Sequence, residues 1–345
     1  MRRDMGLSID YLPLPGRKSA RLDDVLGVAT FGDPPIDLDG TDVPVAAINT
    51  PMLGPGAAIC EVWRSRRPVQ SGQRARVRYR RDDNVLFGCI SVPETAASAC
   101  VGDGNRFALR AATENAYREI FSVLHSVGYG HLLRVWNYLA EINVHSLGTE
   151  RYWQFNKARR DALIACGRDV TGNLPAACAL GSESGSPLVI YFLASKSAPL
   201  AVENPRQTSA YRYPPEYGPR PAFARASVLQ ESSAAMLFVS GTASIVGHET
   251  LHIGDAAAQT RESLANIEAL LGEANRVAGT TRFALGSLAY KVYVRHSSDL
   301  PIIQAQISSA VGSSVRIVYL KADICRRDLL VEIEATGAHC TRTGS

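Results

Sequence analysis

The sequence predicts an α+β protein made of two similar units, and three observations lead to this fold class. The order strand, helix, strand occurs twice in the 345 residues, at an offset of about 150 residues. The strand segments are rich in β-branched residues, which favour extended backbone. Helices with apolar periodicity separate these strands instead of following them as a block, so each unit is expected to combine a sheet with helices.

The first half contains five predicted elements. An apolar strand is predicted over residues 84–92, and a helix with apolar spacing over 116–124. A second strand follows over 132–138. Residues 151–166 have helical spacing again, and the apolar run 187–193 ends this half as a strand.

The second half repeats this order with small differences. Its predicted elements are a strand (235–245), a helix (257–275), a strand (290–295), a helix (300–311) and two strands (315–320 and 329–335). We interpret the repeat as a duplication of one α/β unit. If so, a polar residue present in only one copy is a candidate for function.

The remaining segments lie before and between the two units. Short strands are predicted around residues 46–48 and 57–63, and the basic stretch 64–81 is predicted to be a solvated hairpin or loop. The joining stretch 199–226 is rich in proline, tyrosine and arginine. Its prolines exclude a regular helix, and four aromatic residues within 13 are too many for a disordered linker. An ordered loop at a domain junction, where ligand sites often form, is therefore expected.

We accordingly predict three parts of the chain: an N-terminal domain with extra strands over 1–198, the ordered loop over 199–226, and a C-terminal domain over 227–345. Apolar residues make up 46% of the chain and no run approaches about 20 of them, so no membrane partner is expected. The net charge of +4 is too small to indicate a nucleic-acid partner. Residues 1–5 are basic but no apolar core follows them, so a cytoplasmic protein is expected.

The cysteines do not form a recognisable framework. There are seven, an odd number, with wide spacings and no CxxC pair: Cys60, Cys89, Cys100, Cys166, Cys178, Cys325 and Cys340. This pattern argues against both a disulfide scaffold and a zinc site. His248 to His252 matches HExxH in letters, but its surroundings indicate strand and loop, whereas the motif binds metal only on a helix. No metal site is therefore predicted.

The last predicted strand carries the most informative residues. Side chains alternate along a strand, so Glu332 and Glu334 share one face, opposite Val331 and Ile333. The corresponding strand of the first half, 187–193, is apolar. A buried carboxylate has a raised pKa and can act as a general acid near neutral pH, and Glu332 is the candidate for this role. An exposed or ion-paired strand residue is the alternative interpretation.

Other residue types could hold a polar ligand. Arginines bind carboxylates through two-pronged hydrogen bonds, and the candidates are Arg151, Arg159, Arg160, Arg220 and Arg225. Tyrosine hydroxyls could add hydrogen bonds, from Tyr211, Tyr213 or Tyr217. Cys325 precedes two arginines that could favour its thiolate, but no histidine lies near it in sequence, so a pocket-shaping role is preferred to covalent catalysis. Surface charge or loop packing is the alternative for each arginine and tyrosine.

The chain resembles known proteins at two levels. The stretches 238–244, 259–271 and 331–335 resemble the RidA/YjgF-like fold. Nearly the whole chain is similar to the chorismatase family, with the resemblance carried by the stretches 134–138, 150–152, 213–214, 217–219 and 322–326. The Asp-Ile-Cys-Arg and Val-Glu-Ile-Glu motifs are the more specific part of it. Within the family, the chain looks like the branch that makes 3-hydroxybenzoate, including the bifunctional type that also makes 4-hydroxybenzoate for pigment and ubiquinone pathways.

The resemblance implies a fold and an activity. The fold would be two RidA/YjgF-like (chorismate-mutase-like) α/β units in one chain, with packed sheets and helices on one face. The chain would be an enzyme, a chorismatase that converts chorismate to 3-hydroxybenzoate, and to 4-hydroxybenzoate in the bifunctional type, plus pyruvate. Proton transfer and pyruvate loss require no cofactor. A RidA-like enamine/imine deaminase and a non-catalytic ligand-binding protein are the alternatives, and both a homotrimer and a monomer are left open.

The resemblance also assigns roles to residues. Glu332 would be the proton donor, and Cys325 a pocket residue linked with the 3-hydroxybenzoate outcome, opposite Gly241 and Ala243. The substrate-binding set would be Arg159, Arg225, Arg151, and Tyr211 or Tyr213. Because Arg159 and Arg160 are adjacent, the sequence leaves open which of them binds the carboxylate.

Overall fold

The computed structural model describes residues 6–13, 22–32, 41–54, 59–94, 108–231, 234–280 and 282–340. Three sequence predictions fall outside this part of the chain: the interpretation of residues 1–5, the start of the strand predicted at 57–63, and Cys100. Among the described helices, none is long and apolar enough to cross a membrane. The described residues contain no group of three or more His, Cys, Asp or Glu side chains that could hold a metal ion.

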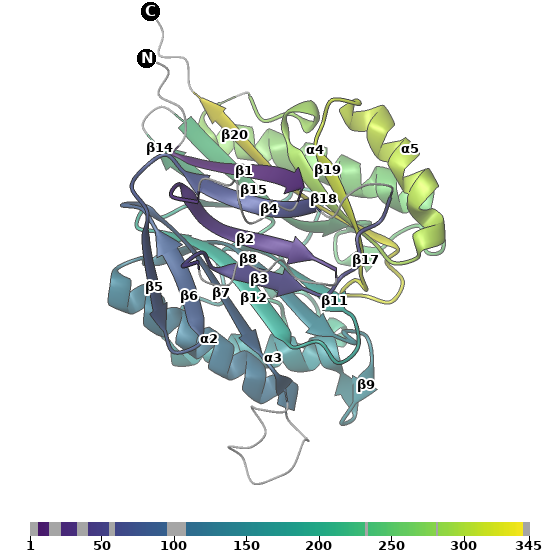
Figure 1. Cartoon of the computed structure of the whole chain (residues 1–345). Coiled ribbons are helices and arrows are strands. Elements are labelled where there is room, and N and C mark those ends of the chain that lie inside the picture. The colour runs from purple at the N-terminus through teal and green to yellow at the C-terminus, as the bar shows by residue number, and fades with distance from the viewer. Residues whose placement is uncertain are drawn as a thin grey trace, which may run out of the picture.

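The first unit is a six-stranded sheet with two helices on one face (Figure 1). In spatial order its strands are β11 (Ala176–Ser182), β8 (His131–Ala140), β12 (Leu188–Ser195), β7 (Val85–Val92), β6 (Val77–Arg81) and β5 (Gln70–Arg74). The helices are α2 (Ala108–Val127) and α3 (Arg151–Ala165). Their apolar residues pack with the outward side chains of β7, β8 and β12 into one core. A small hairpin, β9 (His145–Ser146) and β10 (Thr149–Glu150), precedes α3.

The second unit has the same construction. In spatial order its strands are β13 (Leu200–Val202), β14 (Ala226–Glu231), β15 (Ala234–Ala243), β20 (Val331–Cys340), β18 (Ala289–Val294) and β19 (Ile317–Lys321). The covering helices are α4 (Ala256–Ala278) and α5 (Leu300–Val311). Asp255 caps the start of α4, where its side chain accepts a hydrogen bond from the amide of Ala258, and Gly279 caps the end in the left-handed conformation with φ of 63°. A second hairpin, β16 (Ile245–Val246) and β17 (Glu249–Thr250), follows β15.

The two units match strand for strand. β8 and β18 each pair parallel with the edge strand, β11 or β19, and antiparallel with the central strand, β12 or β20. The helices likewise correspond, α2 to α4 and α3 to α5, in chain order. The predicted α+β class, with two RidA/YjgF-like units and helices on one face of each sheet, is confirmed. The division at residues 198 and 226 remains a prediction.

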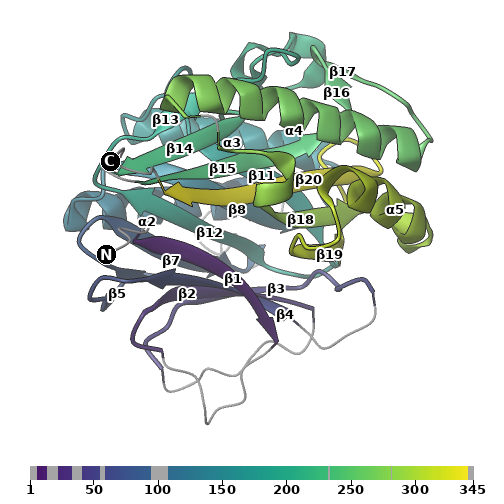
Figure 2. The ribbon, with the colours of Figure 1, turned by 90° about the horizontal axis from the view of Figure 1, so that it is seen from above.

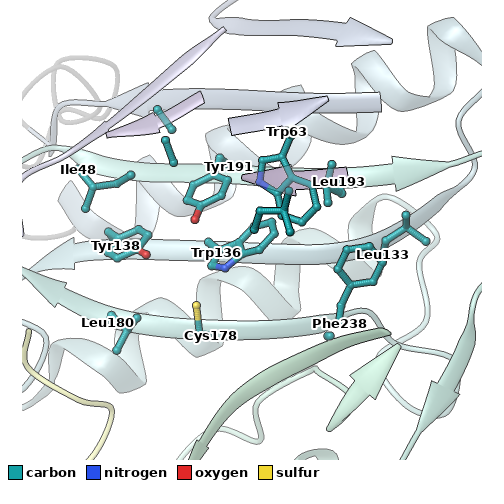
Figure 3. Packing of buried hydrophobic residues seen from close by; sticks show 14 of the residues in the cluster. Ile48, Trp63, Leu133, Trp136, Tyr138, Cys178, Leu180, Tyr191, Leu193 and Phe238 are labelled. Atoms are coloured by element: carbon teal, nitrogen blue, oxygen red, sulfur yellow. The ribbon is translucent and has the colours of Figure 1, made fainter. Parts of the chain in front are cut away.

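A third sheet completes the molecule. Its four strands are β1 (Leu7–Pro13), β4 (Ile59–Ser65), β2 (Val25–Phe31) and β3 (Val45–Ile48), in that spatial order. Figure 2 shows this sheet on the side of the molecule away from α4. The faces of all three sheets that point away from the helices meet in one core, which includes Trp63, Trp136, Tyr191 and Phe238 (Figure 3). The sheet faces of both units that point away from the helices are thus buried within one chain.

Some elements differ from the sequence prediction. β11 was not predicted, because its sequence AACALGS contains no β-branched residue. β1 and β2 were also missed. β13 falls within the stretch expected to be a loop, where two short 3-10 turns, η1 (Ala210–Arg212) and η2 (Pro215–Tyr217), follow it. The basic hairpin is confirmed as β5–β6, and the HExxH segment is strand and turn around β17, so its two histidines do not share a helical face.

Candidate active site

A cavity of about 240 Å³ lies between the two units. Its wall combines α3 and the β9–β10 hairpin of the first unit with β15 and β20 of the second. Two further pieces complete it: the junction segment (residues 203–225) and the β19–β20 loop (residues 322–330). A smaller chamber of about 30 Å³ is lined in part by α3 and β11, and Glu332 borders both spaces.

Glu332 reaches the cavity because of the alternation of side chains along β20. Val331 and Ile333 pack into the helix-covered core of the second unit, so Glu332 and Glu334 point to the opposite face, between the sheets. Glu332 is only 4% exposed. Burial raises the pKa of its carboxyl group to about 8, and the nearby negative charge of Glu334 adds to this effect. At neutral pH the group is therefore mainly protonated.

Gly241 provides the space that the Glu332 side chain occupies. A Cβ atom on Gly241 would lie 1.8 Å from Oε1 of Glu332 and 3.1 Å from Cβ of Cys178. The register of β15 against β20 shifts between Val239 and Thr242, which places one extra residue on β15 at this point. Ala243 then pairs opposite Glu332 and also lines the cavity. The bulge and the glycine together open the strand pair beside the carboxyl group.

Cys325 lines both spaces, as Gly241 does. Its Sγ atom is 4.0 Å from Oε2 of Glu332. Burial, together with the nearby carboxyl group of Glu332, raises the pKa of the Cys325 thiol to about 12. The thiol is therefore neutral near pH 7 and a poor nucleophile, so the adjacent Arg326 does not activate it as the sequence alone could suggest.

One stripe of α3 faces the inner chamber. Tyr152, Asn156 and Arg159 recur at helical spacing and all line it, whereas Arg160 does not. Arg159 is 3% exposed and its guanidinium lies over the ring of Tyr117, 5.4 Å from the ring centre. Its Nε atom is buried and has no hydrogen-bond partner among the described residues. The structure therefore directs Arg159, and not Arg160, toward the chamber.

Arg225 approaches the cavity from the junction segment. Its Nη2 atom donates to the carbonyl of Thr208 and to the hydroxyl of Tyr213, both at 2.7 Å. Its Nε atom is buried and has no partner within the described chain, as with Arg159. Arg326 also lines the cavity, with its guanidinium 4.5 Å from the ring centre of Tyr217. Its Nη2 atom is buried and has no hydrogen-bond partner among the described residues. Buried N–H groups of this kind are suited to an anionic ligand.

Arg295, at the end of β18, holds the β19–β20 loop in place. Its Nε atom donates to the carbonyl of Leu329 at 2.7 Å. Its Nη2 atom donates to the carbonyls of Ile324 and Arg326, at 3.1 and 2.8 Å. Three carbonyls of the loop that carries Cys325 are thus fixed by one side chain.

Not every candidate from the sequence lies at the cavity. Tyr211 does not line it and packs against the core of the first unit. Arg151 is bonded to Glu94 and to the carbonyl of Ala140, and does not line it either. The Nε atom of Arg220 donates to the carbonyl of Tyr213, which supports the junction segment from outside the cavity wall. We therefore leave these three residues out of the proposed binding set.

Several wall residues were not selected from the sequence. They are Tyr152, Trp153, Asn156, Phe223, Arg326 and Arg327. Tyr152, Asn156 and Arg159 share an i, i+4, i+7 spacing, which could have singled out Arg159 from its neighbour. The position of Trp153 could not be predicted, because it depends on Gly218, where a Cβ atom would lie 2.4 Å from the indole ring.

The wall thus combines one protonated carboxyl group, a neutral thiol and three arginines that are not fully bonded. Such a site can bind an anion with more than one negative group and deliver a proton to it.

Comparisons with known proteins agree in the family they indicate. Residues 61–194 match the family model described as "Chorismatase FkbO/Hyg5-like, N-terminal". A 3-hydroxybenzoate synthase of Streptomyces hygroscopicus is 38% identical over 294 residues, which cover 82% of this chain and 83% of that protein.

The chain belongs to the chorismatase family. A chorismatase of the same organism is 35% identical over 316 residues, covering 90% of this chain and 88% of the relative. A chorismatase crystal structure at 1.08 Å resolution superposes with a TM-score of 0.85 and 32% identity, covering 96% of this chain and 98% of that one. The chain is therefore an enzyme with the complete chorismatase fold, including the third sheet.

Proposed function

We propose that this enzyme converts chorismate to 3-hydroxybenzoate and pyruvate in the cavity between its two units, with Glu332 as the general acid. One observation carries the proposal: a buried carboxyl group with a pKa of about 8 borders two spaces, and among the arginines that line them, Arg159, Arg225 and Arg326 each have a buried N–H group without a partner in the described part of the chain. Chorismate has two carboxylates and an acid-sensitive enolpyruvyl ether, so it needs both features. The names of the relatives, which include a 3-hydroxybenzoate synthase, support the choice of substrate and product.

The protonated Glu332 donates its proton to the methylene carbon of the enolpyruvyl group. A new C–H bond forms, and the ether carbon takes on oxocarbenium character. The bond between ring carbon C3 and the ether oxygen then breaks as the C4 hydroxyl oxygen bonds to C3, so pyruvate leaves and the hydroxyl proton returns to Glu332. The C3–C4 epoxide formed in this way opens at its C4–O bond, and the hydrogen on C3 is lost as a proton while the oxygen gains one, which gives aromatic 3-hydroxybenzoate. Opening at the C3–O bond with loss of the C4 hydrogen gives 4-hydroxybenzoate instead. Pyruvate and hydroxybenzoate together contain all the atoms of chorismate, so the conversion needs no oxidant or reductant.

The arginines hold the two carboxylates of the substrate. Arg159 in the inner chamber and Arg225 at the main cavity lie on different wall segments, α3 and the junction segment, as two separate carboxylates require. Tyr213 supports Arg225 through its hydroxyl group, 2.7 Å from Nη2. Each charge-assisted hydrogen bond to a buried carboxylate contributes about 1.5–3 kcal/mol to binding.

Cys325 and Gly241 shape the wall on either side of the Glu332 carboxyl group. We propose that this wall selects 3-hydroxybenzoate as the main product, with 4-hydroxybenzoate as the second. The neutral thiol takes no covalent part in the reaction, since its pKa of about 12 leaves almost no thiolate at pH 7.

The deciding experiment is incubation with chorismate, with chromatography of the aromatic products and an assay for pyruvate, for the wild type and Glu332→Gln. The variant is expected to lose at least about 10²-fold in kcat while still binding chorismate, because a glutamine cannot supply the proton. Glu273→Gln, at the surface of α4, is the matched control and should retain full activity. Wild-type turnover by Glu332→Gln would refute the acid role, and ammonia release from an enamine without chorismate turnover would favour a deaminase.

A further inference from the structure

Glu334, two residues from Glu332 on the same strand, has four hydrogen-bonding partners. Its Oε1 atom accepts from Nε1 of Trp136 and from Nζ of Lys291, both at 2.8 Å. Its Oε2 atom accepts from Nη2 of Arg134 at 2.6 Å and from the hydroxyl of Tyr293 at 3.2 Å. Each of these four partner residues is at most 1% exposed. No part of this arrangement touches the cavity, and the mechanism above does not use it.

These contacts belong to a buried cluster of four charges that spans all three sheets. Lys291 of β18 also pairs with Glu61 of β4, with Nζ 2.6 Å from Oε2. Glu61 in turn accepts from Nε1 of Trp63 at 2.7 Å. Two carboxylates and two cations give the cluster no net charge. Buried ion groups of this kind rarely stabilise more than apolar packing would, so their presence calls for another explanation.

We propose that Glu334 is a positioning residue for catalysis: its negative charge keeps the carboxyl group of Glu332, on the same face of β20, protonated. Arg134 and Lys291 in turn hold Glu334 in its ionised form. This inference rests on the proposed role of Glu332 as the acid. The two carboxyl groups lie on one buried face of β20, where their interaction is little screened by water. The carboxyl groups of Glu332 and Glu334 therefore cannot easily be ionised at the same time. Because Glu334 has two cationic partners, Glu334 is the ionised one.

The groups around Glu332 agree with this division. Burial of Glu332 favours its neutral form, and the charge of Glu334 acts in the same direction, while the cations Arg134 and Arg225 oppose them. Cys325, Cys178 and Tyr152 also face it, but burial raises the pKa of each of these groups, so they stay neutral near pH 7. Glu334 is thus the one negative charge among these neighbours, and Lys291 and Arg134 lower its pKa against the opposing effect of burial.

The test compares two substitutions in the same cluster. Glu334→Gln removes the negative charge beside Glu332, whereas Glu61→Gln removes an equal charge from β4, at the far side of Lys291. Both leave the cluster with one excess positive charge, so damage to the cluster is matched. Two quantities are measured against pH: kcat/KM for chorismate, and the infrared band of the protonated carboxyl group that disappears in Glu332→Gln.

Glu334→Gln is expected to move the titration of Glu332 and the alkaline limb of kcat/KM to lower pH by about one unit or more. The direction follows because the acid form is the active one and loses its proton sooner. Glu61→Gln is expected to leave both curves at the wild-type position. An unshifted titration in Glu334→Gln, or equal shifts in the two variants, would overturn the proposal.

Two further variants guard against loss of the fold. The double variants Glu334→Gln/Lys291→Met and Glu61→Gln/Lys291→Met each remove one anion and one cation, so the cluster keeps zero net charge. The first is expected to shift the Glu332 titration downward, and the second to leave it unchanged because the pair of Glu334 with Arg134 remains. The infrared titration needs no turnover. If Glu332 proves not to be the acid, this measurement still decides whether Glu334 controls its charge.

Discussion

The Oε1 atom of Glu332 occupies the space that a side chain at position 241 would need: a Cβ atom on Gly241 would be 1.8 Å from it. Gly241→Ala is therefore expected to displace the carboxyl group and to lower kcat by about 10²-fold, since a shift of about 1 Å in a catalytic group costs this much. Steady-state kinetics with chorismate provide the measurement. Gly272→Ala on α4, where the added Cβ meets nothing within 4 Å, is the control, and equal activity of the two variants would contradict the argument.

The adjacent arginines of α3 allow a matched comparison. Each has one buried nitrogen without a hydrogen-bond partner among the described residues, but only Arg159 borders the inner chamber, whereas Arg160 lines neither space. Arg159→Met is expected to weaken chorismate binding by about 10- to 100-fold, the loss of one charge-assisted contact. Arg160→Met should bind as the wild type does. Binding is best measured by calorimetry in the Glu332→Gln background, where the substrate should not turn over, and the reverse order of effects would refute the assignment.

Cys325 is expected to influence the product more than the rate. Cys325→Ala removes a sulfur atom that lies 4.0 Å from the Glu332 carboxyl group, so the cavity becomes larger there while the acid itself is unchanged. The ratio of 3- to 4-hydroxybenzoate should therefore change more than total pyruvate release. Chromatography of both products from the same reaction gives the answer, and an unchanged ratio would exclude the pocket-shaping role. The wild-type thiol should also resist iodoacetamide at about pH 8, because its pKa is raised to about 12.

Arg295 should control the same wall from a distance. Arg295→Met leaves three loop carbonyls without their donor, at a cost of about 1–3 kcal/mol for each buried group. We expect a lower thermal unfolding temperature and a shifted product ratio. Arg276→Met, at an exposed site of α4, is the control for loss of an arginine. A destabilised Arg295→Met with the wild-type product ratio would show that the β19–β20 loop does not help to choose the product.

Glu332 also makes stability depend on pH. Its folded-state pKa of about 8 lies above the ordinary 4.5, so its contribution is fully present below about pH 4.5 and is lost as the pH rises through about 8. A glutamine at position 332 does not ionise, so the free energy of unfolding of Glu332→Gln does not fall in this way. In urea unfolding, the free energy of unfolding of the variant should therefore rise relative to that of the wild type by a few kcal/mol between about pH 5 and about pH 8.5. A constant difference between the two proteins across this range would mean that Glu332 is not buried in its neutral form.

Much of the fold could be predicted from the sequence, for a physical reason. Strands β7, β8, β12, β15, β18 and β20 and helices α2 to α5 bury apolar faces, and their periodicity is visible in the residues themselves. β11 lacks this signal. Its small residues fit against the β19–β20 loop, where a Cβ on Gly181 would lie 2.6 Å from Asp323, and such a requirement arises only between distant segments.

The sequence by itself determined that Glu332 and Glu334 share one strand face, that only the second unit has them, and that Cys325 stands nearby. It left open which carboxyl group is charged. Arg134 bonds to Glu334 across 200 positions of sequence, and Lys291 links it to Glu61 of the third sheet. Only the tertiary structure therefore decided the protonation of Glu332. A pKa depends on burial and on neighbouring charges, and here these come from three sheets that meet only when the chain is folded.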